Sequence, residues 1–275
     1  MKKKSILSII LAGALTFGLV GCGASNSSSS ASKEDKTIKI GVSPVPHKEI
    51  VEEAKPLLEK EGYKVEIIEF TDYVQPNTAL AEGDLDANYY QHIPYLDEQN
   101  KSKGLNLTYT AQIHLEPMGL YSKTIKSLDD IKDGDTVAIP NDPSNEARAL
   151  KLLALHGVIK VSDGELITPN DIIENPKNLK FSELEAASIP RVLDDFNVAV
   201  INGNYALPAG FEPSKDAIII EDKNSEAAKP YGNILAVKKG DEEKEKIKVL
   251  TKALTSPEVK QFIETKYNGA VISVF

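Results

Sequence analysis

The stretch TIKIGVSPVPHKEIVEEAKPLLEKEGYKVEIIEF, residues 37–70, decides the fold of this chain. Thr37 to Val42 alternates and predicts a strand, and Lys64 to Phe70 predicts a second strand after a turn at residues 61–63. A helix is predicted between them, from about His47 to Glu61. A strand, a helix and another strand in this order are typical of a parallel α/β sheet.

The alternation continues along the chain and then returns to its start. Further strands are predicted at 87–91, 136–140, 179–184, 198–201, 217–221 and 233–238, and helices at 76–82, 144–156, about 186–196 and twice within 241–267. This order predicts two α/β lobes joined by two hinge crossings: residues 37–120 with 233–275 in lobe 1, and 121–232 in lobe 2. Facing lobes place the carboxyl ends of strands around a cleft, where ligands of open α/β sheets bind.

The N-terminus carries the pattern of an export signal. Three lysines precede an apolar run from Ile6 to Val20, which is shorter than the about 20 residues of a membrane span. Gly21 then precedes Cys22, the chain's single cysteine, in a spacing that resembles the bacterial lipobox. We expect residues 1–21 to be a signal peptide and Cys22 to be lipidated, with an ordinary cleaved signal as the alternative. Residues 22–36 are polar and rich in serine, which predicts a flexible tether.

Composition narrows the range of partners. The formal net charge of −9 becomes −12 when the three lysines of the signal are removed, which disfavours nucleic acid and anionic lipid. Attachment to the cell membrane would therefore depend on the lipid at Cys22. Acylation would also leave no thiol for a disulfide or a metal. The chain has no GxSxG, GxxxxGK[ST] or HExxH motif, so we expect neither an enzyme nor a cofactor.

Arg148 is one of only two arginines in the chain. It falls near the first turn of a predicted helix, where a cation is unfavourable and an anion is favourable. A carboxylate or phosphate beside it would explain the position, because arginine binds such groups with two parallel hydrogen bonds. The alternative is an exposed arginine paired with Glu146 or Asp142. The other arginine, Arg191, is expected to form an intrahelical ion pair with the acids three and four residues later.

Aromatic and amide side chains gather near predicted strand ends. Tyr89, Tyr90, His92 and Tyr95 form a cluster that Tyr73 could join, and aromatic faces suit an apolar or thioether side chain. Packing in the core or at the surface is the alternative for each ring.

Three polar residues fit the main chain of an α-amino acid. Asn202 and Asn233 lie at strand ends, and an amide can accept from an ammonium and donate to a carboxylate. Glu116 could supply the negative partner of the ammonium. Asparagines that only form turns are the alternative.

Two other functions stay open at this point. A metal receptor for zinc or manganese could use His47, His92 and His114 with a carboxylate, although their placement is irregular. The second alternative function is that of a surface lipoprotein acting as an adhesin or antigen.

Seven motifs resemble those of the NlpA lipoprotein family, the methionine-binding receptors of bacterial ABC importers. They are EFTDYVQPN (69–77), GDLDAN (83–88), QHIPYL (91–96), IPNDPSN (139–145), ENPKNLK (174–180), LEA (184–186) and AVIN (199–202). The resemblance runs from about Ile38 to Ala270. It implies a periplasmic-binding-protein-like fold of type II that closes over L-methionine and docks, as a monomer, on the permease and ATPase of an importer.

The resemblance also implies a set of ligand-binding residues. Four would line the side-chain pocket, one would bind the carboxylate and two would hold the amino-acid backbone; these are Tyr73, Tyr90, His92 and Tyr95, then Arg148, then Asn202 and Asn233. With Glu116, and with Asn145 from the IPNDPSN motif, nine residues are expected in the site. The family commonly has phenylalanine where this chain has Tyr90. The added hydroxyl would favour a more polar ligand, a methionine derivative or a short methionine-containing peptide.

Overall fold

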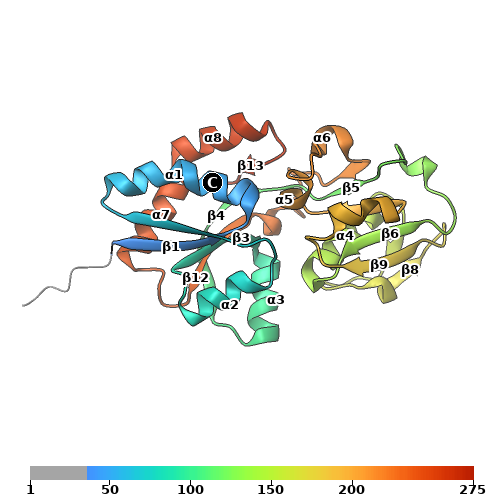
Figure 1. Ribbon diagram of the computed structural model, residues 1–275. Coiled ribbons are helices and arrows are strands. Elements are labelled where there is room, and N and C mark those ends of the chain that lie inside the picture. Colours follow the sequence, from blue (N-terminus) through green and yellow to red (C-terminus); the bar gives the residue numbers. More distant parts are fainter. Residues whose placement is uncertain (1–35) are drawn as a thin grey trace, which may run out of the picture. The chain divides into compact units, whose positions relative to one another are not determined.

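The computed structural model describes residues 36–275, which form one unit built on two mixed sheets (Figure 1). The predicted signal peptide, Cys22 and all but the last residue of the predicted tether lie outside the described residues. Among the helices that the structure describes, none combines the length and the apolar character needed to cross a membrane.

A six-stranded sheet forms the core of one lobe. Its strands are, in spatial order, β13 (Ile272–Ser273), β4 (Leu107–Leu115), β12 (Asn233–Lys238), β3 (Ala87–His92), β1 (Thr37–Val42) and β2 (Lys64–Glu69). β1 is parallel to β2 and β3, as the opening stretch predicts, whereas β12 is antiparallel to β3 and β4. β12 follows all of the second sheet in the chain, so the chain returns to its first sheet near its end.

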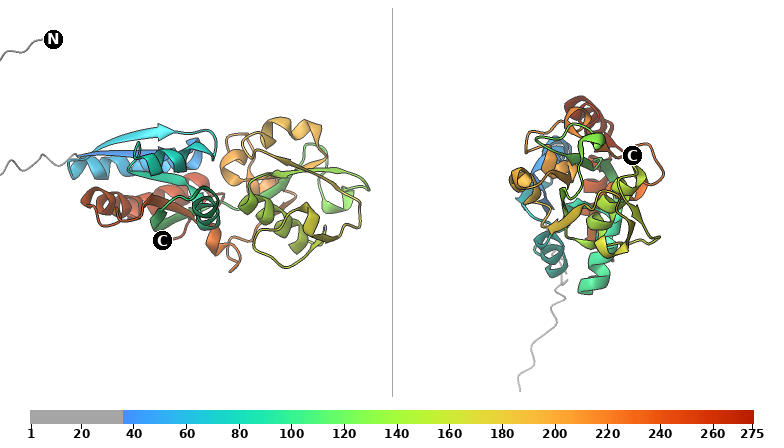
Figure 2. Two further views of the ribbon diagram at one scale, coloured as in Figure 1. Left: turned by 90° about the horizontal axis from the view of Figure 1, so that it is seen from below. Right: turned by 90° about the vertical axis from the view of Figure 1, so that its right-hand side faces the viewer.

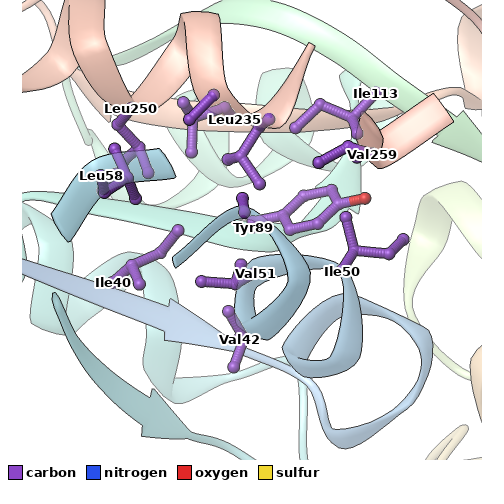
Figure 3. Close-up of a cluster of buried hydrophobic side chains, with 14 of the residues drawn as sticks. Ile40, Val42, Ile50, Val51, Leu58, Tyr89, Ile113, Leu235, Leu250 and Val259 are labelled. Atoms are coloured by element: carbon purple, nitrogen blue, oxygen red, sulfur yellow. The ribbon is translucent and has the colours of Figure 1, made fainter. Parts of the chain in front are cut away.

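Helices cover both faces of this sheet (Figure 1). One face carries α1 (Glu49–Lys60), α7 (Glu245–Leu254) and α8 (Pro257–Tyr267), with the kinked turn η1 (Pro44–Lys48) before α1. The other face carries α2 (Gln75–Glu82) and α3 (Ile93–Lys103). Figure 3 shows part of the core on the first face, where Leu58 of α1 lies beside Leu250 of α7, with Val51 of α1 nearer Ile40 of β1.

A five-stranded sheet forms the core of the other lobe. Its order is β11 (Ile219–Ile220), β5 (Gly119–Tyr121), β10 (Val198–Ile201), β6 (Thr136–Pro140) and β9 (Lys180–Leu184). α4 (Pro143–Leu155) packs on one face, and the 3-10 helix η4 (Ile189–Asp195) with α5 (Gly203–Ala206) packs on the other. Smaller elements complete the lobe: β7 (Lys160–Val161), β8 (Ile172–Glu174), α6 (Pro213–Asp216), and the 3-10 turns η2 (Leu128–Asp130), η3 (Pro169–Asp171) and η5 (Lys229–Tyr231).

The chain crosses between the sheets twice. The first crossing is residues 116–118, between β4 and β5, and the second is residues 221–232, between β11 and β12. The two are tied together, because the Glu221 N–H donates to the Met118 carbonyl at 3.0 Å and the Met118 N–H donates to Glu221 Oε2 at 2.9 Å. Figure 2 shows the C-terminal helices beside the N-terminal strands, in the lobe of the six-stranded sheet. The lobe boundaries expected at 120/121 and 232/233 stay a prediction.

Two predicted features differ in the structure. The helix expected at 186–196 is the shorter 3-10 helix η4, and the ion pair expected for Arg191 is wrong. Arg191 Nη2 donates to Ser188 Oγ at 3.2 Å, while Asp194 pairs with Lys123 at 2.5 Å. The sequence analysis did not predict α3 or the strands β4 and β5. Pro94 near the start of α3 fits a first helical turn, and the Nδ1 of His92 caps the helix by accepting from the Tyr95 N–H at 3.2 Å.

Leu250→Ala should destabilise the protein by about 2–5 kcal/mol, because the fully buried Leu250 would leave a cavity between α7, α1 and the sheet. Leu155→Ala is the matched control, since Leu155 is 75% exposed and its loss should stay within about 0.5 kcal/mol. Urea unfolding followed by circular dichroism measures both. Equal losses for the two variants would contradict the assignment of this core.

Candidate ligand site between the lobes

A small cavity with about 20 Å³ of free volume lies where the carboxyl ends of β2, β3, β6 and β10 meet between the two lobes. This volume is enough for about one water molecule, so the lobes lie closed around the site. Side chains from both lobes and from the first crossing line it: Tyr73, Tyr90, Gln91, His92, Tyr95, Glu116, Asn145, Arg148, Asn202, Gly203, Asn204 and Asn233.

All nine residues expected in the site line this one cavity. That they bind a ligand stays a prediction. Gln91, Gly203 and Asn204 are additional lining residues. Gly203 is needed for close approach of the lobes, because a Cβ at this position would lie 2.7 Å from the Cβ of Glu116.

Arg148 is buried, and its anionic partner is neither Glu146 nor Asp142 but Glu221 of the second crossing. Nε donates to Glu221 Oε1 at 2.7 Å and Nη2 to Oε2 at 2.5 Å, while Nη2 also donates to the Glu116 carbonyl at 3.0 Å. The Tyr231 ring stacks on the guanidinium at 4.2 Å. Burial acts to lower the pKa of Arg148, but Glu221 outweighs it and the pKa is raised. These bonds leave Nη1 as the guanidinium nitrogen without a hydrogen-bond partner among residues 36–275.

Three tyrosines form an aromatic wall of the cavity. The rings of Tyr73, Tyr90 and Tyr95 lie 5.8–6.0 Å apart, centroid to centroid. Their hydroxyls bond to protein: Tyr90 and Tyr95 donate to the Tyr73 carbonyl at 3.3 and 2.8 Å, and Tyr73 donates across the lobes to Asn204 Oδ1 at 2.5 Å. Tyr89, which the sequence analysis grouped with this wall, points the other way because side chains alternate along β3; it is fully buried in the core (Figure 3).

Asparagine side chains also line the cavity, among them Asn145, Asn202 and Asn204. Asn145 Oδ1 accepts from Asn202 Nδ2 at 2.7 Å and lies 3.1 Å from His92 Nε2, so one oxygen joins α4 to β10 and β3. Burial lowers the pKa of His92 to about 3, with the charge of Arg148 adding to the effect, so this ring is neutral near pH 7. Asn202 Oδ1 and Asn204 Nδ2 are buried without a hydrogen-bond partner among residues 36–275. They offer the cavity one acceptor and one donor.

Glu116 lines the cavity from the first crossing. Its Oε1 lies 2.6 Å from His114 Nε2 and 3.5 Å from His47 Nε2. His47 Nε2 is also 3.0 Å from the Oδ1 of Asn233, the last residue of the expected set. Burial raises the pKa of Glu116 to about 7, against the opposing charges of His47 and Arg148.

The histidines proposed for a metal do not form one group. His47 and His114 lie with Glu116, all within 4.8 Å, but His92 lies with Asn145 and against the Tyr231 ring. His92 lies apart from the other two histidines because its side chain turns to α3, where Nδ1 caps the helix.

The cavity is thus lined by hydrogen-bond donors and acceptors, with aromatic rings beside them. Arg148 Nη1 and Asn204 Nδ2 can donate to a carboxylate, and Asn202 Oδ1 and the Glu116 carboxylate can accept from an ammonium. This combination suits a small zwitterion with an apolar side chain. Two residues that hold Arg148, Glu221 and Tyr231, were missed by the sequence analysis, since neither lies near it in the chain.

Comparisons with known proteins identify the family of this chain. The model of the NlpA lipoprotein family matches residues 38–275. The D-methionine-binding lipoprotein MetQ of Salmonella typhi is 43% identical over 262 residues, covering 94% of this chain and 93% of that protein. Because this relative is named for methionine, the metal-receptor alternative is not supported.

Solved structures give the same result. A lipoprotein from Ruminococcus gnavus is 52% identical with a TM-score of 0.86, covering 87% of this chain and all of that one. A nutrient-binding protein from Burkholderia cenocepacia, solved with methionine bound, is 48% identical with a TM-score of 0.83, covering 86% of this chain and all of that one. With a family model that spans both lobes and relatives this similar, the chain belongs to the NlpA lipoprotein family.

Proposed function

We propose that this protein is a lipid-anchored receptor that binds methionine outside the cytoplasm and delivers it to an ABC importer. Lipid at Cys22 holds the receptor on the cell membrane. The receptor acts as a monomer and docks on the permease, which the importer's ATPase drives. The relatives that are named for methionine or solved with it support this function.

The observation that carries the proposal is one cavity whose lining offers, among residues 36–275, both donors and acceptors without a protein partner, beside an aromatic wall. Arg148 Nη1 with Asn204 Nδ2 binds the carboxylate of methionine, while Asn202 Oδ1 and Glu116 bind its ammonium. The thioether lies against Tyr73, Tyr90 and Tyr95, since sulfur makes favourable contacts with aromatic rings.

Methionine itself fits better than a more polar derivative. The Tyr90 hydroxyl, which could have favoured a polar ligand, donates to the Tyr73 carbonyl at 3.3 Å. It therefore faces main chain, and position 90 presents its ring to the cavity.

Arg148→Ala should weaken methionine binding about 100-fold or more, because the ligand carboxylate loses a buried charged donor. Arg191→Ala is the matched control, since the chain's other arginine is exposed and distant from the cavity lining. Calorimetric titration of ligand-free protein with L- and D-methionine measures both variants against the wild type.

A changed ligand tests the role of Arg148 in the wild-type protein, so the result does not depend on how the Arg148 variant folds. Methioninamide keeps the ammonium and the thioether but lacks the carboxylate, so the wild type should bind it about 100-fold more weakly than methionine. Equal affinity for the two ligands would contradict the role of Arg148, and no heat with either methionine isomer would contradict the proposed function.

Tyr90→Phe should leave the methionine affinity within about threefold of the wild type, because the lost hydroxyl bonds to main chain rather than to ligand. Tyr73→Phe is the contrasting variant. It removes a 2.5 Å hydrogen bond between the lobes and should weaken binding. A loss of tenfold or more in Tyr90→Phe would show that its hydroxyl acts on the ligand.

Cys22→Ala should move the protein from the membrane fraction to the soluble fraction and leave methionine affinity unchanged, since the cavity lies in residues 73–233. Cell fractionation with immunoblotting measures retention, and titration measures affinity. Ser25→Ala, three residues into the predicted tether, should keep membrane retention. A Cys22→Ala protein that stays on the membrane would rule out this anchor.

A further inference from the structure

Beside the cavity, at Glu116, lies a buried cluster of three titratable side chains: His47, His114 and Glu116. Their exposed fractions are 1%, 0% and 5%, and each comes from a different segment: η1, the end of β4 and the first crossing. Both histidines point Nε2 at the same carboxylate oxygen, Glu116 Oε1, at 3.5 and 2.6 Å. Only Glu116 of the three lines the cavity.

The hydrogen bonds around this cluster are compatible with one additional proton, held by either of two groups. The Tyr89 hydroxyl hydrogen-bonds to His114 Nδ1 from the core, and His114 Nε2 faces Glu116 Oε1. His47 Nε2 lies between Asn233 Oδ1 and Glu116, and His47 Nδ1 has no hydrogen-bond partner among residues 36–275. A proton can therefore reside on the Glu116 carboxyl or on His47, and in either case the cluster is electrically neutral.

Among residues 36–275, no lysine or arginine forms an ion pair with the Glu116 carboxylate. Arg148 contacts only its backbone carbonyl, at 3.0 Å, and the Arg148 charge is balanced by Glu221. Within residues 36–275, the ion-pair partners of the Glu116 carboxylate are the two imidazoles. A buried carboxylate without a cation is unfavourable, so either a proton or the ammonium of a ligand must neutralise it.

We propose that this protein exchanges a proton for its ligand: an ammonium that binds at Glu116 displaces one proton from the Glu116–His114–His47 cluster to solvent. The inference rests on the proposed function, because it requires an amino-acid ligand with its ammonium at Glu116. The exchange balances in charge, since one positive charge leaves the cluster as another arrives. No covalent bond changes except the one that releases the proton to buffer.

The exchange falls in an accessible pH range. Burial raises the pKa of Glu116 to about 7 and lowers those of His47 and His114 to about 4 and about 3. Below about pH 7 the cluster holds its proton, and methionine must displace it. Apparent affinity should therefore fall as the pH is lowered, by about tenfold per pH unit below 7.

The other titratable groups that act on the cluster do not change their protonation state between pH 6 and 8. Arg148 on α4 stays cationic, with its pKa raised, and burial raises the pKa values of three tyrosines from the other packed elements. These are Tyr73 after β2, Tyr89 on β3 and Tyr267 on α8. Proton release between pH 6 and 8 would thus come from the cluster itself.

Calorimetry counts the protons directly. Methionine is titrated into the ligand-free full chain in phosphate and in imidazole buffer, whose ionisation enthalpies differ, and the difference in heat gives the protons released. We expect about 0.9 proton released at pH 6, about 0.5 at pH 7 and about 0.1 at pH 8. The ammonium of free methionine stays protonated over this range, so it does not contribute.

Two variants assign the proton. Glu116→Gln should bind methionine more weakly and release no proton at pH 6. Glu146→Gln is the matched control, because Glu146 is a buried carboxyl on α4 whose pKa burial also raises to about 7, but it does not line the cavity. It should release the same number of protons as the wild type.

The outcomes separate this inference from the proposed function. Binding of methionine with no proton released at pH 6 would overturn the exchange and leave the receptor function intact. Release that persists in Glu116→Gln, or that disappears in Glu146→Gln, would also overturn it. An absence of heat in both buffers would overturn the proposed function, and the exchange with it. Because the wild-type count is decisive alone, the test does not depend on how the variants fold.

Discussion

The ion pair between Arg148 and Glu221 joins the cavity to both crossings of the chain. A guanidinium removed from water needs nearby acceptors, and here they come from the segments that connect the lobes. Glu221 in the second crossing supplies both carboxylate oxygens, and Glu116 in the first supplies its carbonyl. Since Glu221 Oε2 also accepts from the Met118 N–H, moving either crossing would break a bond to a buried charge.

The two charged groups that line the cavity are held in different ways as a result. Arg148 is neutralised by Glu221 and held by the Tyr231 ring, so its charge is permanent and its direction is set. Among residues 36–275, the ion-pair partners of the Glu116 carboxylate are two histidines, which titrate. Under the proposed function, a zwitterion would add to an existing ion pair at Arg148 and replace a proton at Glu116.

Much of the fold and of the site could be predicted because strand ends are a local feature of the sequence. The carboxyl ends of parallel strands meet at one edge of each sheet, and these edges of the two sheets border one cavity. Tyr73, which follows β2, therefore lies at the same cavity as Arg148 and Asn202, which follow β6 and β10. The helix α3 was not predicted, because its start reads as a loop around Pro94. Its cap depends on the His92 side chain, whose rotamer the sequence does not specify.

Partners across long distances could not be predicted. Arg148 and Glu221 are 73 residues apart, and nothing near either residue indicates the other. The sequence indicated an anion beside Arg148, because the start of a helix is unfavourable for an unpaired cation. It could not tell whether that anion was a ligand or part of the protein. In the structure, one anion beside Arg148 is Glu221, which belongs to the protein. The remaining guanidinium nitrogen, Nη1, is available to a second anion. A local rule thus predicted the need for charge balance, whereas the two crossings decide which groups provide it.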